Sequence, residues 1–215
     1  MIFLKQTWNL HPASPAGRDR FVEHAEKALI PAWASVGGDL KGAFFSTEEW
    51  FYQVTHVVAF EDLAAFDRAR TAIDQSGEFA ELRAGDEALA PERGTALLED
   101  LGPVAAESLD AGIAKAAEKP AGEYTFAILE VSPGRMDDFK KLLGAGAAQL
   151  PILASWRDVV GNPSQVIDLW RGNPGQAPYA PSNPAMEAGF FGPLREVAPR
   201  ERMMRLFPMP YSPLV

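Results

Sequence analysis

The chain has 215 residues, of which 47% are hydrophobic and 23% charged, as in a folded globular protein. It contains no cysteine, which excludes disulfides, thiolate nucleophiles and zinc–sulfur sites. Its formal net charge of -9 argues against nucleic acid as a partner, because phosphate binding requires a basic surface. No apolar run approaches the roughly 18 residues that cross a bilayer, and the N-terminus lacks the pattern of a signal peptide. We therefore expect a cytoplasmic protein that does not contact membranes.

The first half of the chain predicts the element order β-α-β-β-α-β. Strands are indicated by alternating apolar and polar residues or by aromatic and β-branched runs, and helices by apolar residues three and four apart. The predicted strands are residues 2–10, 40–45, 50–60 and 95–101, and the predicted helices are residues 18–36 and 61–89. This order is typical of the ferredoxin-like split βαβ unit. Its helices cover only one face of the sheet, so the other face needs a cover.

The same order repeats in the second half. An alanine-rich helix is predicted at residues 103–119 and ends at Pro120-Ala121-Gly122. The strands that follow are predicted at residues 123–131, 152–160, 165–170 and 201–207, and the helices at 136–150 and 184–197, the last of them broken near Pro193.

Short residue matches also relate the two halves. Residues 53–56 (QVTH) correspond to residues 165–168 (QVID) at an offset of 112 positions. We therefore predict a first ferredoxin-like unit at 1–102, a helical connector at 103–122 and a second unit at 123–215. The predicted fold class is α+β, with tandem duplicated β-α-β-β-α-β units that form an intrachain pseudo-dimeric α/β barrel.

One loop has no counterpart in the first half. Residues 172–184 (GNPGQAPYAPSNP) are long for a loop and rich in proline. They are either a semi-rigid lid that carries Tyr179 or a surface loop stiffened by proline.

His56 is the first candidate for chemistry. On a strand spanning 50–60 it would share a face with Trp50, Tyr52, Val54 and Val58, which makes an apolar and partly aromatic wall. An imidazole there titrates near neutral pH and can accept a proton from an activated carbon or phenol. The alternative is a core histidine held by one hydrogen bond.

Asp168 corresponds to His56 in the second half. An aspartate between Ile167 and Leu169 is costly to bury without a partner, so we expect an ion pair with Arg157 or Arg171. Asp168 is then either a structural ion-pair member or a catalytic acid.

The remaining candidates are substrate contacts. Aromatic and charged side chains on the predicted strands could line a ligand cavity, and those chosen are Trp8, Tyr52, Arg157 and Trp170. The three histidines are widely spaced and show no metal-binding signature, so no metal site is expected.

The doubled element order resembles the NIPSNAP family, within the dimeric α/β barrel (ferredoxin-like) superfamily. That family often shows a histidine, a tryptophan and an aromatic residue at alternate positions of the third strand, followed by a helix with two arginines. The corresponding residues here are His56, Val58, Phe60, Arg68 and Arg70, so the tryptophan is missing. The second half has Asp168 in place of the histidine and keeps the tryptophan as Trp170. The ending PMPYSPL, residues 208–214, also looks like the family's usual ending.

The resemblance implies a small-molecule site, since the superfamily includes cofactor-free monooxygenases, polyketide cyclases, haem enzymes and proteins with no known activity. We expect an enzyme that binds a hydrophobic or aromatic substrate in a barrel pocket, with His56 as general base and neither metal nor nucleotide. Proton abstraction would lead to cyclisation, isomerisation or direct oxygenation. The alternatives are a haem protein with His56 as axial ligand and a non-catalytic binding or scaffold module. A homodimer is also left open.

Overall fold

The computed structural model describes residues 1–172 and 184–215. The predicted lid with Tyr179 therefore lies almost wholly outside the described residues. The chain divides into two compact units, of which the first comprises residues 1–98 and 207–215 and the second residues 99–206. Residues 207–215 thus belong to the same compact unit as residues 1–98. The predicted domain boundaries stay a prediction, since compactness alone does not test independent folding.

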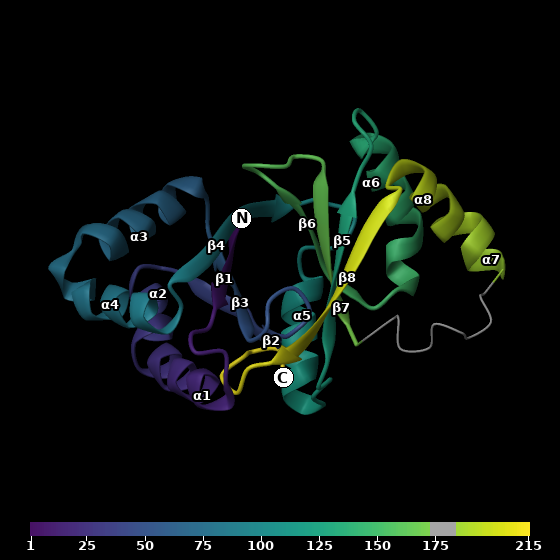
Figure 1. The fold of residues 1–215 in the computed structure, drawn as a ribbon. Helices are drawn as coiled ribbons and strands as arrows, with labels where there is room; N and C mark the ends of the chain where they lie inside the picture. The colour runs from purple at the N-terminus through teal and green to yellow at the C-terminus, as the bar shows by residue number, and fades with distance from the viewer. Residues whose placement is uncertain (173–183) are drawn as a thin grey trace. The chain divides into compact units, whose positions relative to one another are not determined.

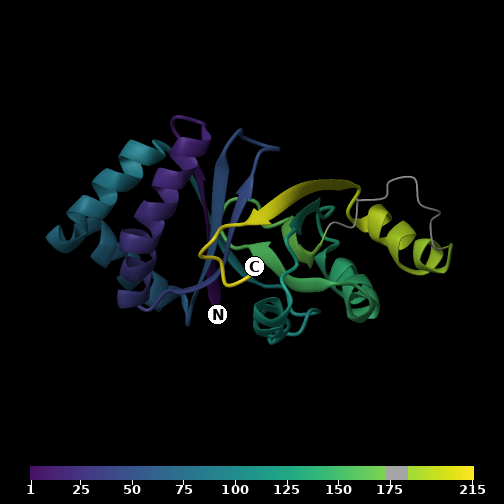
Figure 2. The same ribbon diagram turned by 90° about the horizontal axis from the view of Figure 1, so that it is seen from below.

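The first unit follows the predicted order β-α-β-β-α-β. Its strands are β1 (Ile2–Asn9), β2 (Asp39–Ser46), β3 (Gln53–Phe60) and β4 (Glu92–Asp100). Its helical segments are α1 (Pro15–His24), η1 (Ala25–Leu29), α2 (Ile30–Ser35), α3 (Leu63–Gln75), η2 (Gly77–Phe79) and α4 (Ala80–Leu89). Both ribbon views place these helices on one face of the unit's strands (Figure 1, Figure 2).

The second unit repeats this order after the connecting helix α5 (Ser108–Glu118). Its strands are β5 (Tyr124–Glu130), β6 (Ile152–Asp158), β7 (Gln165–Arg171) and β8 (Arg200–Pro208). Its other helical segments are α6 (Met136–Gly146), η3 (Ala147–Gln149), α7 (Pro184–Met186), η4 (Glu187–Phe191) and α8 (Gly192–Val197). Among the described residues, no helix combines the length and the apolar character needed to cross a bilayer.

Strand order confirms the predicted fold class. The described strands form a closed barrel in the order β1-β3-β2-β8-β5-β7-β6-β4. Around this ring each unit repeats the ferredoxin-like order of fourth, first, third and second strand. The fold is therefore α+β, with two β-α-β-β-α-β units in one chain.

A matching irregularity supports the internal duplication. In the first unit the pairing of β2 with β3 shifts register between Leu40 and Gly42, and in the second the pairing of β6 with β7 shifts between Ile152 and Ala154. The two bulges differ by the same 112 positions that relate residues 53–56 to residues 165–168. Because a bulge depends on one extra residue at one place in a strand, its repetition at this offset is strong support for a common origin.

Proline explains two local departures from α-helix. Segment η1 is a π-helix that ends two residues before Pro31, and η4 is a π-helix that ends two residues before Pro193. A proline lacks the N–H that would bond the carbonyl four residues earlier, and its ring crowds that carbonyl, so a wider turn relieves both problems. The predicted break near Pro193 is therefore wrong, because the chain stays helical from Pro184 to Val197.

The start of the third strand also differs from the prediction. Strand β3 begins at Gln53, and Tyr52 has a φ of 64°, a left-handed conformation that a strand cannot contain. Trp50 and Phe51 are 45% and 62% exposed in the turn before it. Trp50 and Tyr52 consequently do not share a strand face with His56.

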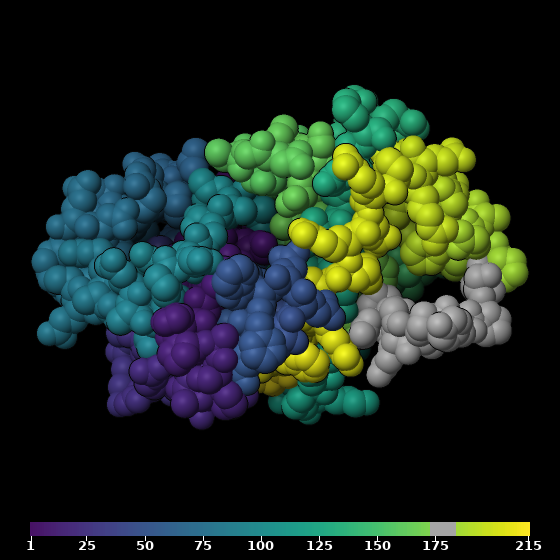
Figure 3. All heavy atoms as spheres, in the orientation of Figure 1, coloured from purple at the N-terminus to yellow at the C-terminus, as the bar shows by residue number. Residues whose placement is uncertain are grey.

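The end of the chain is fixed to β2 in the first unit. Phe44 and Phe45 pair with Pro208 and Phe207, the Met209 N–H donates to the Ala43 carbonyl at 2.9 Å, and the Ala43 N–H donates to Ser212 Oγ at 3.0 Å. The space-filling view shows the β2–β3 hairpin (blue) against this yellow segment (Figure 3). Residues 207–215 therefore complete the first unit.

Candidate functional site

His56 lies in the layer between the sheet and the helices of the first unit. Strand β3 is hydrogen-bonded to β1 on one side and β2 on the other, which places His56 opposite Gln6 and Ala43. Its ring centroid is 4.5 Å from that of Trp8 and 6.1 Å from that of Phe21 on α1. The side chain is fully buried, so the predicted apolar and aromatic surroundings are present, with Trp8 among them.

The imidazole has one polar contact. Its Nε2 lies 2.9 Å from the hydroxyl of Tyr211, while Nδ1 has no hydrogen-bond partner among the described residues. Burial lowers the pKa of His56 from 6.5 to about 3. Burial also raises the pKa of Tyr211 above its usual value, and the charge of Glu26 adds to this. At neutral pH the two groups are therefore a pair of uncharged side chains.

The surroundings of His56 do not fit haem. Nε2 is engaged by Tyr211, and the rings of Trp8, Phe21 and Tyr211 pack around the imidazole with centroids 4.5, 6.1 and 5.5 Å away. A porphyrin could reach the nitrogen only by displacing these side chains. The described residues also contain no group of three His, Cys, Asp or Glu side chains placed to hold a metal ion.

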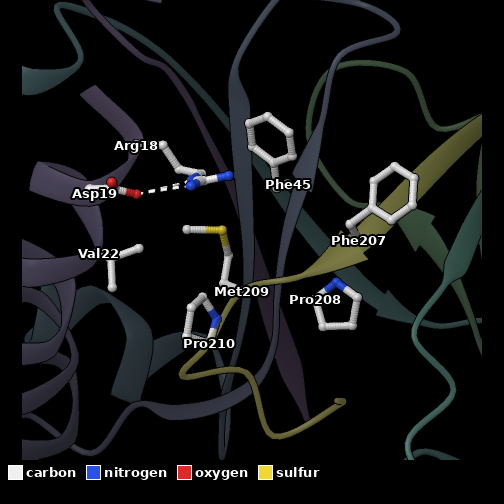
Figure 4. A pocket seen from close by; sticks show the side chains of 8 residues that line it. All are labelled: Arg18, Asp19, Val22, Phe45, Phe207, Pro208, Met209 and Pro210. Carbon is white, nitrogen blue, oxygen red and sulfur yellow. Dashed lines mark hydrogen bonds and ion pairs between the residues drawn. The ribbon is translucent and has the colours of Figure 1, made fainter. Parts of the chain in front are cut away.

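A groove lies where α1 meets the end of the chain (Figure 4). It has a volume of about 460 Å³ and is lined by Arg18, Asp19, Val22, Phe45, Phe207, Pro208, Met209 and Pro210. In the close view Arg18 reaches across toward Phe45 and pairs with Asp19, at 2.9 Å (Figure 4). The side chains of Arg18 and Asp19 are 42% and 68% exposed. The groove therefore offers a ligand an apolar wall and an arginine whose charge is already paired.

A second pocket, of about 420 Å³, lies between strands β1 and β4 and the helices of the first unit. We call it the sheet–helix pocket. Its apolar lining consists of Leu4, Leu29, Trp33, Phe66, Ile73 and Leu82. Its polar lining consists of Gln6, Arg70, Asp74, Arg83, Asp86, Glu87, Arg93 and Thr95. An apolar floor with polar groups along one side is typical of small-molecule sites.

Asp86 is the buried carboxylate of this pocket. Only 6% of the residue is exposed, and its Oδ1 lies 2.7 Å from His24 Nε2 while its Oδ2 lies 3.5 Å from Arg93 Nη1. Gly85 allows this contact, because a Cβ there would lie 2.4 Å from His24 Cε1. The carboxylate is therefore held from two sides by groups on α1 and β4.

The sequence analysis missed this cluster. His24 and Asp86 are far apart in the chain, on two helices whose packing the sequence does not reveal. One signal was present, since Asp86 lies four residues after Leu82 and three before Leu89 and so interrupts the apolar stripe of α4.

In the second unit Asp168 occupies the position equivalent to His56. It lies opposite Ala127 and Ser155 and is 3% exposed, and its Oδ1 has no hydrogen-bond partner among the described residues. Burial raises the pKa of Asp168 from 3.8 to about 7, the negative charge of Glu201 adds to the rise, and Ser155 offsets part of it.

The expected ion pair of Asp168 is wrong. Arg157 Nε donates to Glu99 Oε1 at 3.0 Å, and Arg171 Nη2 donates to the Lys119 carbonyl at 2.6 Å. Neither guanidinium group is therefore available to Asp168. Because an unpaired buried charge is costly, the carboxyl group of Asp168 favours its protonated, uncharged form.

The predicted site residues are divided between the units. Trp8 packs against His56 in the first unit with the two rings tilted by 60°, whereas Tyr52 lies in the turn before β3 with its ring 5.2 Å from that of Phe45. Trp170 belongs to the second unit, as do Asp168 and Arg157, and is 7% exposed among apolar side chains of the helix layer. The functional roles of these residues stay predictions.

Comparisons with solved structures bear on the fold. A proposed monooxygenase from Lactobacillus acidophilus NCFM is similar with a TM-score of 0.58 and 13% identity, covering 95% of this chain and 92% of its own. An anthrone oxidase-like protein has a TM-score of 0.57 and 14% identity, covering 99% and 93%. A chlorite dismutase variant from Candidatus Nitrospira defluvii has a TM-score of 0.51 and 10% identity, covering 97% and 91%. At these identities the likeness concerns the fold alone.

Comparisons of the sequence bear on the family. A search of curated proteins finds none that matches this chain significantly. The family model for NIPSNAP matches residues 11–90, which include α1, β3 and α4 of the first unit. This match over residues 11–90 confirms the resemblance that the strand and helix motifs indicated.

Proposed function

We propose that the protein is a small-molecule enzyme that binds a hydrophobic or aromatic substrate in the sheet–helix pocket and acts on it by acid–base chemistry. The observation that carries this proposal is the composition of the pocket. An apolar floor that includes Leu4, Trp33 and Phe66 meets a buried carboxylate, Asp86, within about 420 Å³. This volume lies within the range of roughly 300 to 1,000 Å³ that is usual for small-molecule sites.

Asp86 is the proposed proton acceptor. Its carboxylate lines the pocket, while His24 and Arg93 hold its two oxygens and so fix its direction. A positioned carboxylate can remove a proton from a carbon activated by a neighbouring carbonyl group. Cyclisation, isomerisation or reaction of the resulting carbanion with O₂ would follow. This assigns the role of base to Asp86 in place of His56, because His56 lines neither of the two pockets described above.

Ligand binding is tested with 2-acetylnaphthalene, a flat apolar ketone, while the indole N–H resonance of Trp33 is followed by NMR. Thr95 is an exposed residue on the pocket rim, so Thr95→Trp should fill the entrance and weaken binding at least tenfold. Thr47→Trp, on an exposed turn of the same unit, should bind as the wild type does. A Trp33 resonance that does not respond to the ketone, or equal affinities for the two variants, would refute the site.

Turnover is tested by oxygen consumption with anthrone. One neighbour in fold is named anthrone oxidase-like, which makes anthrone a reasonable first trial substrate. In this reaction one oxygen atom of O₂ enters the new quinone carbonyl and the other leaves as water. Asp86→Asn should lower the rate by about a hundredfold or more, the usual contribution of a general base. Glu81→Gln, an exposed carboxylate of the same helix, should leave the rate unchanged.

A non-catalytic binding module is the second candidate. It is favoured by one observation, that both carboxylate oxygens of Asp86 are already engaged by protein groups, Oδ1 by His24 and Oδ2 by Arg93. This candidate predicts that 2-acetylnaphthalene binds, that anthrone causes no oxygen consumption, and that Asp86→Asn binds the ketone as the wild type does.

A further inference from the structure

We propose that Tyr211, His56 and Gln6 form a hydrogen-bonded row that turns the Gln6 side-chain amide nitrogen toward the sheet–helix pocket. The pocket then selects molecules that carry a hydrogen-bond acceptor, such as an aromatic ketone. The choice of ligand rests on the proposed function, whereas the row itself does not.

The direction of the hydrogen bond between Tyr211 and His56 decides the tautomer of the imidazole. A tyrosine hydroxyl can donate one hydrogen and accept another, and a neutral imidazole has one donor nitrogen and one acceptor nitrogen. The hydroxyl of Tyr211 lies 2.9 Å from His56 Nε2. If the hydroxyl donates, Nε2 is the acceptor and the ring hydrogen is on Nδ1. His56 then needs an acceptor on its Nδ1 side.

Gln6 supplies that acceptor. It lies directly opposite His56 in the register of β1 and β3, so both side chains point to the same face of the sheet. Gln6 Oε1 and His56 Nδ1 are both enclosed and both lack a hydrogen-bond partner among the described residues. A hydrogen bond from Nδ1–H to Oε1 would satisfy the two atoms together, which is the rule for buried polar groups. With Oε1 as the enclosed amide atom, the opposite tautomer would leave two acceptors facing each other.

The amide nitrogen of Gln6 is then free for the pocket that Gln6 lines. Two other donors line the same side, since β4 contributes the guanidinium of Arg93 and the hydroxyl of Thr95. Opposite them is the apolar floor of Leu4, Trp33 and Phe66. A flat apolar molecule would lie on this floor with its carbonyl oxygen toward β1 and β4.

His56 thus becomes a positioning residue. It is separated from the pocket by Gln6, and its neutral ring determines which end of an amide the pocket presents. This would explain why a titratable group is kept in a fully buried place among aromatic rings.

The row is tested on the free protein by ¹⁵N NMR of the histidine rings. The proposal predicts that His56 is protonated on Nδ1 and that its Nδ1 and Nε2 signals have the shifts of a donor and an acceptor. Gln6→Leu removes the acceptor and should shift the Nδ1 resonance or move the hydrogen to Nε2. Gln75→Leu, on an exposed position at the end of α3, should change neither. The proposal would be overturned if the wild-type ring carried its hydrogen on Nε2, or if Gln6→Leu left the chemical shift of Nδ1 unchanged.

The selectivity is tested with two probes of the same shape, 2-acetylnaphthalene and 2-ethylnaphthalene. The wild type should bind the ketone about 3- to 10-fold more tightly than the hydrocarbon, which is the contribution of one neutral hydrogen bond. In Gln6→Leu this ratio should be clearly lower, because the amide donor is lost and only the donors of β4 remain. Equal binding of both probes by the wild type contradicts the selectivity. If neither probe binds, the proposed function fails at this pocket, while the NMR result still decides the row.

Discussion

His56 and Asp168 hold equivalent positions in the two units, yet burial affects their charges in opposite ways. Each lies on the third strand of its unit and on the face that packs against helices. Burial lowers the pKa of the imidazole to about 3 and raises the pKa of the carboxyl to about 7. Both residues avoid a buried charge, the histidine by losing its proton and the aspartate by keeping it.

The first prediction concerns the stability that His56 contributes. Its pKa in the folded state is below the value of 6.5 of the unfolded chain, so the unfolded chain binds more protons as the pH falls below 6.5. The free energy of unfolding should therefore decrease between pH 6.5 and 4, by about 3 kcal/mol from this group. Urea titrations of the wild type and His56→Asn check this. The difference in unfolding free energy between the two proteins should change between pH 6.5 and 4. A difference that stays constant over this range would contradict the prediction.

The second prediction concerns Asp168 and has the opposite sign. Its folded pKa of about 7 exceeds 3.8, so stability from this group is present below pH 4 and is lost as the pH rises through 7. Asp168→Asn, which keeps the shape and has no charge, should gain roughly 4 kcal/mol of stability relative to the wild type between pH 4 and 8. Asp158→Asn, whose carboxylate caps the exposed turn after β6, provides a comparison at a charged site of the same unit. Parallel pH curves for wild type and Asp168→Asn would show that the carboxyl is not protonated in the folded protein.

Predictions for single residues succeeded where the surroundings of a side chain depend on its own strand alone. A histidine among β-branched and aromatic residues was expected to be buried, and it is. The partner of that histidine could not be found in the same way, because Tyr211 comes from the end of the chain. The same limit applies to His24 and Asp86, whose contact depends on how α1 and α4 pack.

At the scale of helices, two close approaches depend on glycine. Gly146 ends α6 where it meets Phe190 of η4, and a Cβ at Gly146 would lie 2.2 Å from Phe190 Cδ2. Gly144 lies in the same helix, where a Cβ would be 3.7 Å from Pro103 Cβ, an ordinary contact. Alanine substitutions at the two positions therefore distinguish the effect of helix propensity from the effect of packing.

The third prediction uses this pair. Gly146→Ala should destabilise the protein by about 1 to 3 kcal/mol, because the buried ring of Phe190 must move. Gly144→Ala should instead stabilise it by about 0.5 to 1 kcal/mol, since alanine is the better helix former. Thermal unfolding of both variants provides the measurement. A Gly146→Ala protein as stable as Gly144→Ala would mean that η4 does not pack against α6 in solution.

Element order was largely predictable because hydrophobic periodicity determines which face each segment buries. Strands β1 and β2 agree with the predicted ranges to within one residue, and α5 lies inside the predicted connector helix. Errors arose where backbone geometry overrode composition. Trp50 and Tyr52 have strand-forming side chains but lie in a turn, and Pro193 was read as a break although a π-turn accommodates it.

At the scale of the whole molecule, the first unit is made from both ends of the chain. Residues 207–215 bring Met209 and Leu214, which are 2% and 0% exposed, together with the hydroxyl that bonds His56. No periodic pattern in the sequence indicates that this short proline-rich ending belongs to the first half. The pairing depends on the return of the chain along β8, which is a property of the complete fold.

The fourth prediction is that ending the chain at Phe207 selectively loosens the first unit. The deletion removes two buried apolar side chains, each of which stabilises the fold by about 2 to 3 kcal/mol. Hydrogen exchange should become faster for the backbone amides of β2 and β3 and stay unchanged for those of β7. A milder variant, Ser212→Ala, should accelerate exchange at Ala43 N–H alone. Uniform acceleration in both units would argue against the division into two compact parts.

This return of the chain has a consequence for biosynthesis. The ribosome makes the chain from its N-terminus, so residues 1–98 emerge well before residues 207–215, which complete the same unit. Until Tyr211 has emerged, His56 and the neighbouring ring of Trp8 lack its side chain as a cover. Nascent chains stalled before residue 207 should therefore expose this aromatic surface to chaperones, and chains stalled after residues 207–215 have emerged should bury it.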